Sequence, residues 1–335
     1  MASAPGIEVF STCPPSAGVP GDVYRDRVAD VARWSEEAGC RGILVYSDNS
    51  LVDPWLLSAI IVQHTRALAP LVAIQPVYMH PYWVAKQVAS LGHLYGRKLY
   101  LNMVAGGFKN DLEALNDMTP HDQRYARLVE YTAIITRLLA APGGITFEGA
   151  YHTVRNLKLT PALPAGLQPT VFVSGSSDAG VDSARALGAT AIRYPKPAGE
   201  EERPPEGLAA VGIRVGIIAR EREADAWAVA RARFPEDRKG QLTHQLAMKV
   251  SDSSWHKQLS TMADEAAESP YWLVPFQNYK TMCPYLVGSY GRVARELAGY
   301  MALGYTAFIL DVPPDRDELQ HTAAAFDRAR QAVAA

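Results

Sequence analysis

The 335-residue sequence has no excess of either charge. It carries 33 lysine and arginine residues against 35 aspartate and glutamate residues, which gives a formal net charge of −2 at pH 7. Proteins that bind nucleic acid or anionic membranes electrostatically concentrate positive charge. The balanced composition gives no support to either partner, and we expect neither to bind.

Cysteine is scarce, and long apolar runs are missing. Cys13, Cys40 and Cys283 are far apart and form no CxxC pair, which indicates reduced thiols rather than a disulfide framework. No apolar run approaches the ~20 residues that cross a bilayer. The opening MASAPGIEVF lacks the basic segment and apolar core of a signal peptide. We therefore expect a cytoplasmic protein.

Several catalytic signatures are also absent. No GxGxxG follows the first predicted strand, and no GxSxG elbow occurs anywhere. Neither a pair of acids nor a His-rich ligand set follows the predicted strands, so a hydrolase or metal site is not expected. This pattern favours a bound organic cofactor that supplies the chemistry itself.

Strand-like apolar runs alternate with segments of helical spacing along the chain. Alternation of this kind indicates a parallel sheet, and eight strands favour a closed (β/α)8 barrel over an open doubly wound sheet. We expect one domain over residues 1–335, with an aromatic insertion around 234–285 that acts as a lid. The predicted strands are Ile7–Cys13, Gly42–Tyr46, Leu71–Ile74, Lys98–Val104, Val171–Val173, Thr190–Tyr194, Ile213–Ala219 and Thr306–Leu310.

The stretch VFVSGSSDAGVDSARALG contains the strongest local signal for a binding site. It begins with the strand Val171–Val173, continues through a loop of small residues, and becomes helical at Asp178. The first N–H groups of a helix lack intrahelical acceptors, and the helix dipole favours an anion there. The loop therefore predicts a phosphate site, with a plain turn capped by Ser177 or Asp178 as the structural alternative.

Catalytic residues of a barrel lie where its strands end. Three candidates lie within or after predicted strands: Cys13, His80 and Arg214. Each has a structural alternative as well. Cys13 is equally a small buried hydrophobe, His80 a solvent-exposed imidazole, and Arg214 a cation paired with an acid.

The segment VAKQVASLGHLYGRKLYLNMVAGG, followed by HDQRYARLVEY, resembles the bacterial luciferase-like flavin monooxygenases. Further similarity lies in Asp53-Pro54-Trp55, in VAIQP on the third strand, in GAYHTVRNLKL before the fifth, and in the SGSSD loop. The similarity covers roughly residues 7–315 and is greatest to the alkanesulfonate monooxygenase branch.

The resemblance implies an enzyme that takes reduced FMN from a separate NAD(P)H:flavin reductase and uses O2 to oxygenate a small organic molecule. It also implies a homodimer or homotetramer. In this reading the flavin ring meets Asn102 and Val104 and lies near Ala73. Tyr125 and the loop hold the ribityl phosphate, and the loop residues are Ser174, Gly175, Ser176 and Ser177.

The sequence departs from the alkanesulfonate branch at four positions that serve sulfonate binding and catalysis there. They are occupied here by Leu51, Gly216, Tyr279 and Pro313. We therefore expect a larger apolar or aromatic substrate instead of a short alkanesulfonate. Neighbouring aromatic residues favour this prediction: Tyr78, Tyr82, Trp83, Trp255, Tyr271, Trp272 and Tyr285.

Two other functions remain open at this point. The same fold can carry a dehydrogenase that uses a deazaflavin or a tightly held flavin without oxygen insertion. It can also form a non-catalytic flavin-binding partner subunit. The sequence identifies neither the substrate nor the atom that is oxygenated.

Overall fold

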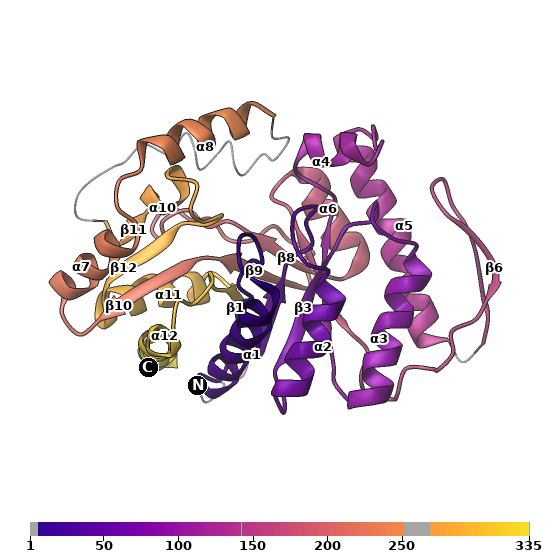
Figure 1. Cartoon of the computed structure of the whole chain (residues 1–335), viewed down its shortest axis with the longest axis horizontal. Coiled ribbons are helices and arrows are strands. Elements are labelled where there is room, and N and C mark those ends of the chain that lie inside the picture. Colours follow the sequence, from indigo (N-terminus) through magenta and orange to yellow (C-terminus); the bar gives the residue numbers. More distant parts are fainter. Residues whose placement is uncertain (1–5, 142, 251–268, 335) are drawn as a thin grey trace.

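Eight parallel strands close into a barrel in the computed structural model, which describes residues 6–141, 143–250 and 269–334. Figure 1 shows helices around this barrel. The fold predicted from strand–helix alternation is therefore confirmed. The strands, in their order around the barrel, are β1 (Glu8–Thr12), β13 (Ala307–Ile309), β9 (Ala210–Arg214), β8 (Thr190–Arg193), β7 (Thr170–Ser174), β4 (Tyr100–Val104), β3 (Ala69–Ile74) and β2 (Gly42–Val45).

Some of the helices begin or end at residues that satisfy their free backbone groups. Asp53 caps one N-terminus by accepting a hydrogen bond from the Trp55 N–H at 2.9 Å. Another helix ends at Gly96, whose φ of +60° suits glycine. The helices are α1 (Gly21–Glu37), α2 (Pro54–His64), α3 (Pro81–Tyr95), α4 (Lys109–Ala114), α5 (His121–Ala140), α6 (Asp178–Leu187), α7 (Glu223–Arg233), α8 (Arg238–Val250), α10 (Val274–Gln277), α11 (Tyr290–Ala302) and α12 (Arg316–Ala334).

Aromatic side chains fill the interior of the barrel. The rings of Phe10, Tyr100 and Phe172 meet edge to face, with centroids 5.1 to 5.7 Å apart. This geometry is favourable for aromatic rings, and it leaves the barrel as a packed core. A ligand site must therefore lie above this layer, in the loops that follow the strands.

One predicted strand is wrong in its extent. The run Ile213–Ala219 is divided between β9, which starts earlier at Ala210, and β10 (Gly216–Arg220). β10 leaves the barrel because the Gly216 N–H donates to the Pro284 carbonyl. It pairs with β12 (Tyr285–Ser289), which also pairs with β11 (Tyr271–Trp272), so the three strands form a separate side sheet.

A two-stranded hairpin precedes β7 and contains part of the GAYHTVRNLKL segment. It consists of β5 (Ile145–Glu148) and β6 (Thr153–Leu157), paired antiparallel. Figure 1 shows it projecting on the side of α3 and α5. Within the described ranges, no helix combines the length and apolar character that crossing a membrane requires.

Candidate cofactor site

A cavity of about 200 Å³ lies beyond the carboxyl ends of the barrel strands. Loops after β2, β3, β4, β7, β8 and β9 contribute to its wall, as expected for a barrel active site. The lining residues are Ser47, Asp48, Gln75, Asn102, Val104, Ala105, Gly106, Gly107, Phe108, His121, Tyr125, Ser174, Gly175, Ser176, Tyr194, Arg214 and Met282.

The turn between β7 and α6 forms one end of the cavity. The Ser177 hydroxyl caps α6 by accepting the Gly180 N–H at 3.3 Å. Ser176 Oγ is buried and has no hydrogen-bond partner among the residues that the structure describes. A hydroxyl at a helix N-terminus without a partner is the kind of donor that a phosphate oxygen would satisfy.

Tyr125 packs directly against this turn. A Cβ built on Gly175 would lie 2.1 Å from the Tyr125 hydroxyl oxygen, so only glycine fits there. Burial raises the pKa of Tyr125, and a hydrogen bond with Ser177 partly opposes that rise. The phenol therefore remains a hydroxyl at neutral pH. We define Tyr125 and the residues Ser174–Ser177 as the phosphate cradle.

Asn102 and Ser174 connect the cradle to the neighbouring strand. Ser174 Oγ donates to Asn102 Oδ1 at 2.8 Å, which fixes the orientation of the amide. Val104 follows Asn102 along β4 and also lines the cavity. Ala73 pairs with Asn102 in the strand register but belongs to the apolar barrel core, and it does not line the cavity.

Arg214 lines the cavity from the end of β9. Its Nη2 donates to the Tyr46 hydroxyl and lies 3.9 Å from Asp311 Oδ1. Its guanidinium carbon is 5.0 Å from the centre of the Tyr46 ring. Arg214 Nε is buried without a hydrogen-bond partner in the described part of the chain. The Arg214 guanidinium is therefore held by Tyr46 and Asp311, and it lines the cavity.

The other two predicted catalytic residues do not line this cavity. His80 caps α3, where its Nδ1 accepts the Tyr82 N–H at 3.1 Å. Cys13 is buried in the apolar core between the barrel and α1, and burial raises its pKa to about 12. A thiol with that pKa is protonated at neutral pH, so it is a poor nucleophile.

Sequence reasoning missed several lining residues. Asp48 and Gln75 follow β2 and β3, so their place at strand ends was a usable signal. Gln75 Nε2 donates to the Ser47 carbonyl at 3.1 Å and ties the two loops together. His121 begins α5 beside Tyr125, with the two ring centroids 5.2 Å apart. Met282 comes from the insertion, and no local pattern places it here.

Of the aromatic residues named from the sequence, those that the structure describes do not line this cavity. Phe108, Tyr194 and Met282 provide the large apolar surfaces of the cavity. The aromatic residues named from the sequence lie elsewhere in the described structure: Tyr78, Tyr82, Trp83, Tyr271, Trp272 and Tyr285. Trp255 lies outside the described residues. Among the described residues, no group of three His, Cys, Asp or Glu side chains could hold a metal.

Comparisons with known proteins place this geometry in context. The BtrO protein of Niallia circulans, a 4-(gamma-L-glutamylamino)butanoyl-[BtrI acyl-carrier protein] monooxygenase, is 32% identical over 319 residues, 92% of each chain. A long-chain alkane monooxygenase superposes with a TM-score of 0.76 at 15% identity, covering 99% of this chain and 93% of that one. An F420-dependent secondary alcohol dehydrogenase superposes with a TM-score of 0.66 at 15% identity, covering 97% and 99%.

A family model covers most of the chain. The model described as luciferase-like monooxygenase matches residues 7–307. That range contains the phosphate cradle, Asn102 and Arg214, and it includes all the barrel strands except the last residues of β13. The chain therefore belongs to the luciferase-like monooxygenase family.

Proposed function

We propose that the protein is a two-component monooxygenase that uses reduced FMN and O2 to oxygenate a larger apolar or aromatic organic molecule. The observation that carries this proposal is the cavity itself. A phosphate cradle and a buried cation, Arg214, line the same cavity at the end of a luciferase-like barrel. A separate flavin reductase supplies the reduced cofactor, and the enzyme works as a homodimer or homotetramer.

The residues present fit FMN. The cradle offers the Ser176 hydroxyl, the Tyr125 hydroxyl and the first N–H groups of α6 to the phosphate. Asn102 and Val104 line the cavity where the flat ring needs an amide partner and an apolar wall. When bound and reduced, FMN would activate O2 for transfer of one oxygen atom to the substrate.

Arg214 is the residue to which we assign a catalytic role. A guanidinium in a water-poor cavity stabilises negative charge much more strongly than it would in water. The negative charge that Arg214 would stabilise either develops on oxygen during the reaction or is carried by the substrate. His80 and Cys13 line no part of the cavity and have no role in this proposal.

The cavity wall supports a substrate other than a short alkanesulfonate. Phe108, Tyr194 and Met282 give it apolar surface. Met282 belongs to the insertion around 234–285. We assign this insertion the role of a lid, because excluding water from the cavity would suppress side reactions of an oxygen-activating cofactor with water.

The test uses the full-length protein with reduced FMN, a flavin reductase and ¹⁸O2. Candidate substrates are screened for a product that gains one ¹⁸O atom, with short alkanesulfonates included. We expect incorporation into an apolar or aromatic compound and none into the sulfonates. Tight binding of a short alkanesulfonate, or products without ¹⁸O, would contradict the proposal.

One observation favours a second candidate function. The fold similarity to an F420-dependent secondary alcohol dehydrogenase shows that this architecture accommodates a deazaflavin. A dehydrogenase would reduce the deazaflavin at the expense of its substrate and consume no O2. Substrate-dependent deazaflavin bleaching without O2 uptake would support this candidate. Absence of turnover with both cofactors, despite flavin binding, would indicate a non-catalytic partner subunit.

A further inference from the structure

Asp311 connects Arg214 to the side sheet. It follows β13, and its Oδ1 lies 3.9 Å from Arg214 Nη2. Its Oδ2 accepts a hydrogen bond from the Tyr285 hydroxyl at 2.7 Å. The side chains of Arg214 and Asp311 are only 8% and 11% exposed. The two charges therefore interact where water screens them weakly.

Tyr285 is fixed in place by the backbone opposite it. β12 pairs with β10, which brings Tyr285 alongside Gly216. A Cβ on Gly216 would lie 2.3 Å from a carbon of the Tyr285 ring, so the ring occupies the space that any side chain at position 216 would need. Burial raises the pKa of Tyr285 well above its ordinary range, which keeps the hydroxyl protonated as a donor.

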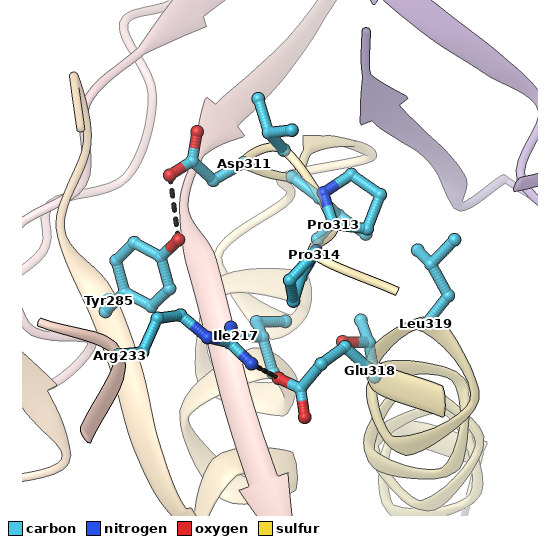
Figure 2. Close-up of a pocket in the computed structure, with 11 residues that line it drawn as sticks. Ile217, Arg233, Tyr285, Asp311, Pro313, Pro314, Glu318 and Leu319 are labelled. Carbon is cyan, nitrogen blue, oxygen red and sulfur yellow. Dashed lines mark hydrogen bonds and ion pairs between the residues drawn. The ribbon is translucent and has the colours of Figure 1, made fainter. Parts of the chain in front are cut away.

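The two neighbouring arginines, Arg220 and Arg233, pair with Glu318 and not with Asp311. Figure 2 shows Asp311 and Tyr285 on one side of a small cavity, and Arg233 reaching Glu318 on the other. Glu318 contacts both Arg220 and Arg233. These two guanidinium groups are therefore satisfied by Glu318, while Asp311 is the carboxylate that pairs with Arg214 in the described structure.

The small cavity separates these two charge clusters. Its volume is about 20 Å³, enough for one water molecule, and Pro313 and Pro314 form part of its wall. Pro313 and Pro314 follow Asp311 after one intervening residue, Val312, and Figure 2 shows them below Asp311 at the cavity. Proline fixes the backbone torsion φ, so the segment that carries the carboxylate is stiff on this side.

We propose that Asp311, itself held by Tyr285, is the positioning residue that keeps the Arg214 guanidinium against Tyr46 and facing the cofactor cavity. This inference rests on the proposed function, in which Arg214 acts in the cavity. A buried arginine without a counter-ion is strongly destabilising. Asp311 thus acts through Arg214 and touches neither cofactor nor substrate.

Two single variants test the two contacts separately. Tyr285→Phe keeps the ring beside Gly216 and removes only the hydroxyl that holds Asp311. Asp311→Asn removes the charge that pairs with Arg214. Arg214→Gln is combined with each to complete two double-mutant cycles. Tyr300→Phe is the matched control, because it also removes a buried hydroxyl, one that donates to the Lys196 carbonyl.

The first readout is thermal unfolding of the full-length protein without cofactor. We expect Asp311→Asn to lower the Tm by roughly 5 °C or more, because it leaves Arg214 unpaired. Adding Arg214→Gln should restore most of this loss. A double variant that melts at or below the temperature expected from simple addition would overturn the pairing.

The second readout is the rate at which reduced FMN on the protein regains its oxidised absorbance after an O2 pulse. We expect Arg214→Gln to change this rate at least fivefold, and Asp311→Asn and Tyr285→Phe at least threefold in the same direction. Neither should add to the effect of Arg214→Gln. The Tyr300→Phe rate should stay within twofold of the wild-type rate.

Rates within twofold of wild type in both single variants, or additive effects in the Arg214→Gln background, would overturn the positioning role. Failure of the proposed function looks different. The protein would then not bind reduced FMN, while the thermal cycle would still decide whether Asp311 pairs with Arg214.

Discussion

At the scale of the residue, Gly175 has the tightest steric requirement in the phosphate cradle. We predict that Gly175→Ala weakens FMN binding at least tenfold, because its Cβ would lie 2.1 Å from the Tyr125 hydroxyl oxygen. Fluorescence titration with FMN measures the change. Gly199→Ala is the control, since a Cβ there has no atom within 4 Å.

Titration with riboflavin separates phosphate contacts from ring contacts. Riboflavin lacks the phosphate, so Gly175→Ala should change its affinity much less than that of FMN. Equal losses for the two ligands would indicate that the β7–α6 turn does not hold the phosphate. Unchanged FMN affinity in Gly175→Ala would remove the cradle from the site altogether.

Individual residues were predictable from sequence only where local chemistry marked them. The small residues Ser174–Ser177 lie between a strand and a helix start, so physical reasoning placed an anion site there, and the cavity is lined by three of the four. Asp311 and Tyr285 are separated by 26 positions and meet only because β12 pairs with β10. No local pattern contains that information.

At the scale of the element, a buried ion pair supports the start of α5. Arg127 Nη2 donates to Asp117 Oδ2 at 2.6 Å, and the Thr119 hydroxyl also donates to Asp117 at 2.6 Å. Burial raises the pKa of Asp117, but these bonds outweigh it and lower the pKa from 3.8 to about 2. The pair anchors the turn that leads to His121 and Tyr125.

This pair predicts a specific acid sensitivity. Asp117 takes up a proton at higher pH when the chain is unfolded, so its stabilising contribution is present above about pH 4 and is lost as pH falls towards 2. Asp117→Asn should reduce the free energy of unfolding by about 1–3 kcal/mol at pH 6. Urea unfolding at pH 6 and pH 3 measures both effects.

The variant should lose less stability than the wild type between those two pH values. Asp26→Asn is the control, because its carboxylate is 73% exposed and makes only a 3.4 Å contact with Arg25. Equal pH dependence in wild type and Asp117→Asn would show that this carboxylate is not linked to folding.

The strand run Ile213–Ala219 shows a limit of prediction for elements. Apart from Arg214 its residues are apolar or glycine, which correctly indicated burial, but apolar character does not say which sheet a strand joins. The change of sheet occurs at Val215 and Gly216, where the chain bonds to Ile309 and Pro284. Both partners are distant in sequence, so the division was visible only in three dimensions.

At the scale of the whole molecule, the thiols give a simple test of the packing. Cys13, Cys40 and Cys283 are all buried and unpaired, and burial raises the pKa of each. A thiol reagent such as DTNB should modify none of them rapidly in the native protein and all three in denaturant. Rapid modification of the native protein would mean that one of these core regions opens readily.

The architecture as a whole was the most predictable feature. Eight apolar runs alternating with helices leave few ways to bury every strand on both faces, and a closed barrel is one of them. The side sheet was not predictable, because β10 precedes the insertion while β11 lies within it and β12 begins where it ends. The same holds for the site. The position of the cradle is predictable from local sequence, whereas the position of the Arg214 side chain depends on Tyr46 and Asp311, which are distant in sequence.

The two halves of the site also lie on different arcs of the barrel. The cradle comes from the end of β7, the turn after it and α5, whereas Arg214 ends β9 and Asp311 follows β13, with β8 between β7 and β9 in the barrel. Changes on one arc need not disturb the other. For laboratory evolution, libraries confined to the loop after β13 leave every residue of the phosphate cradle unchanged.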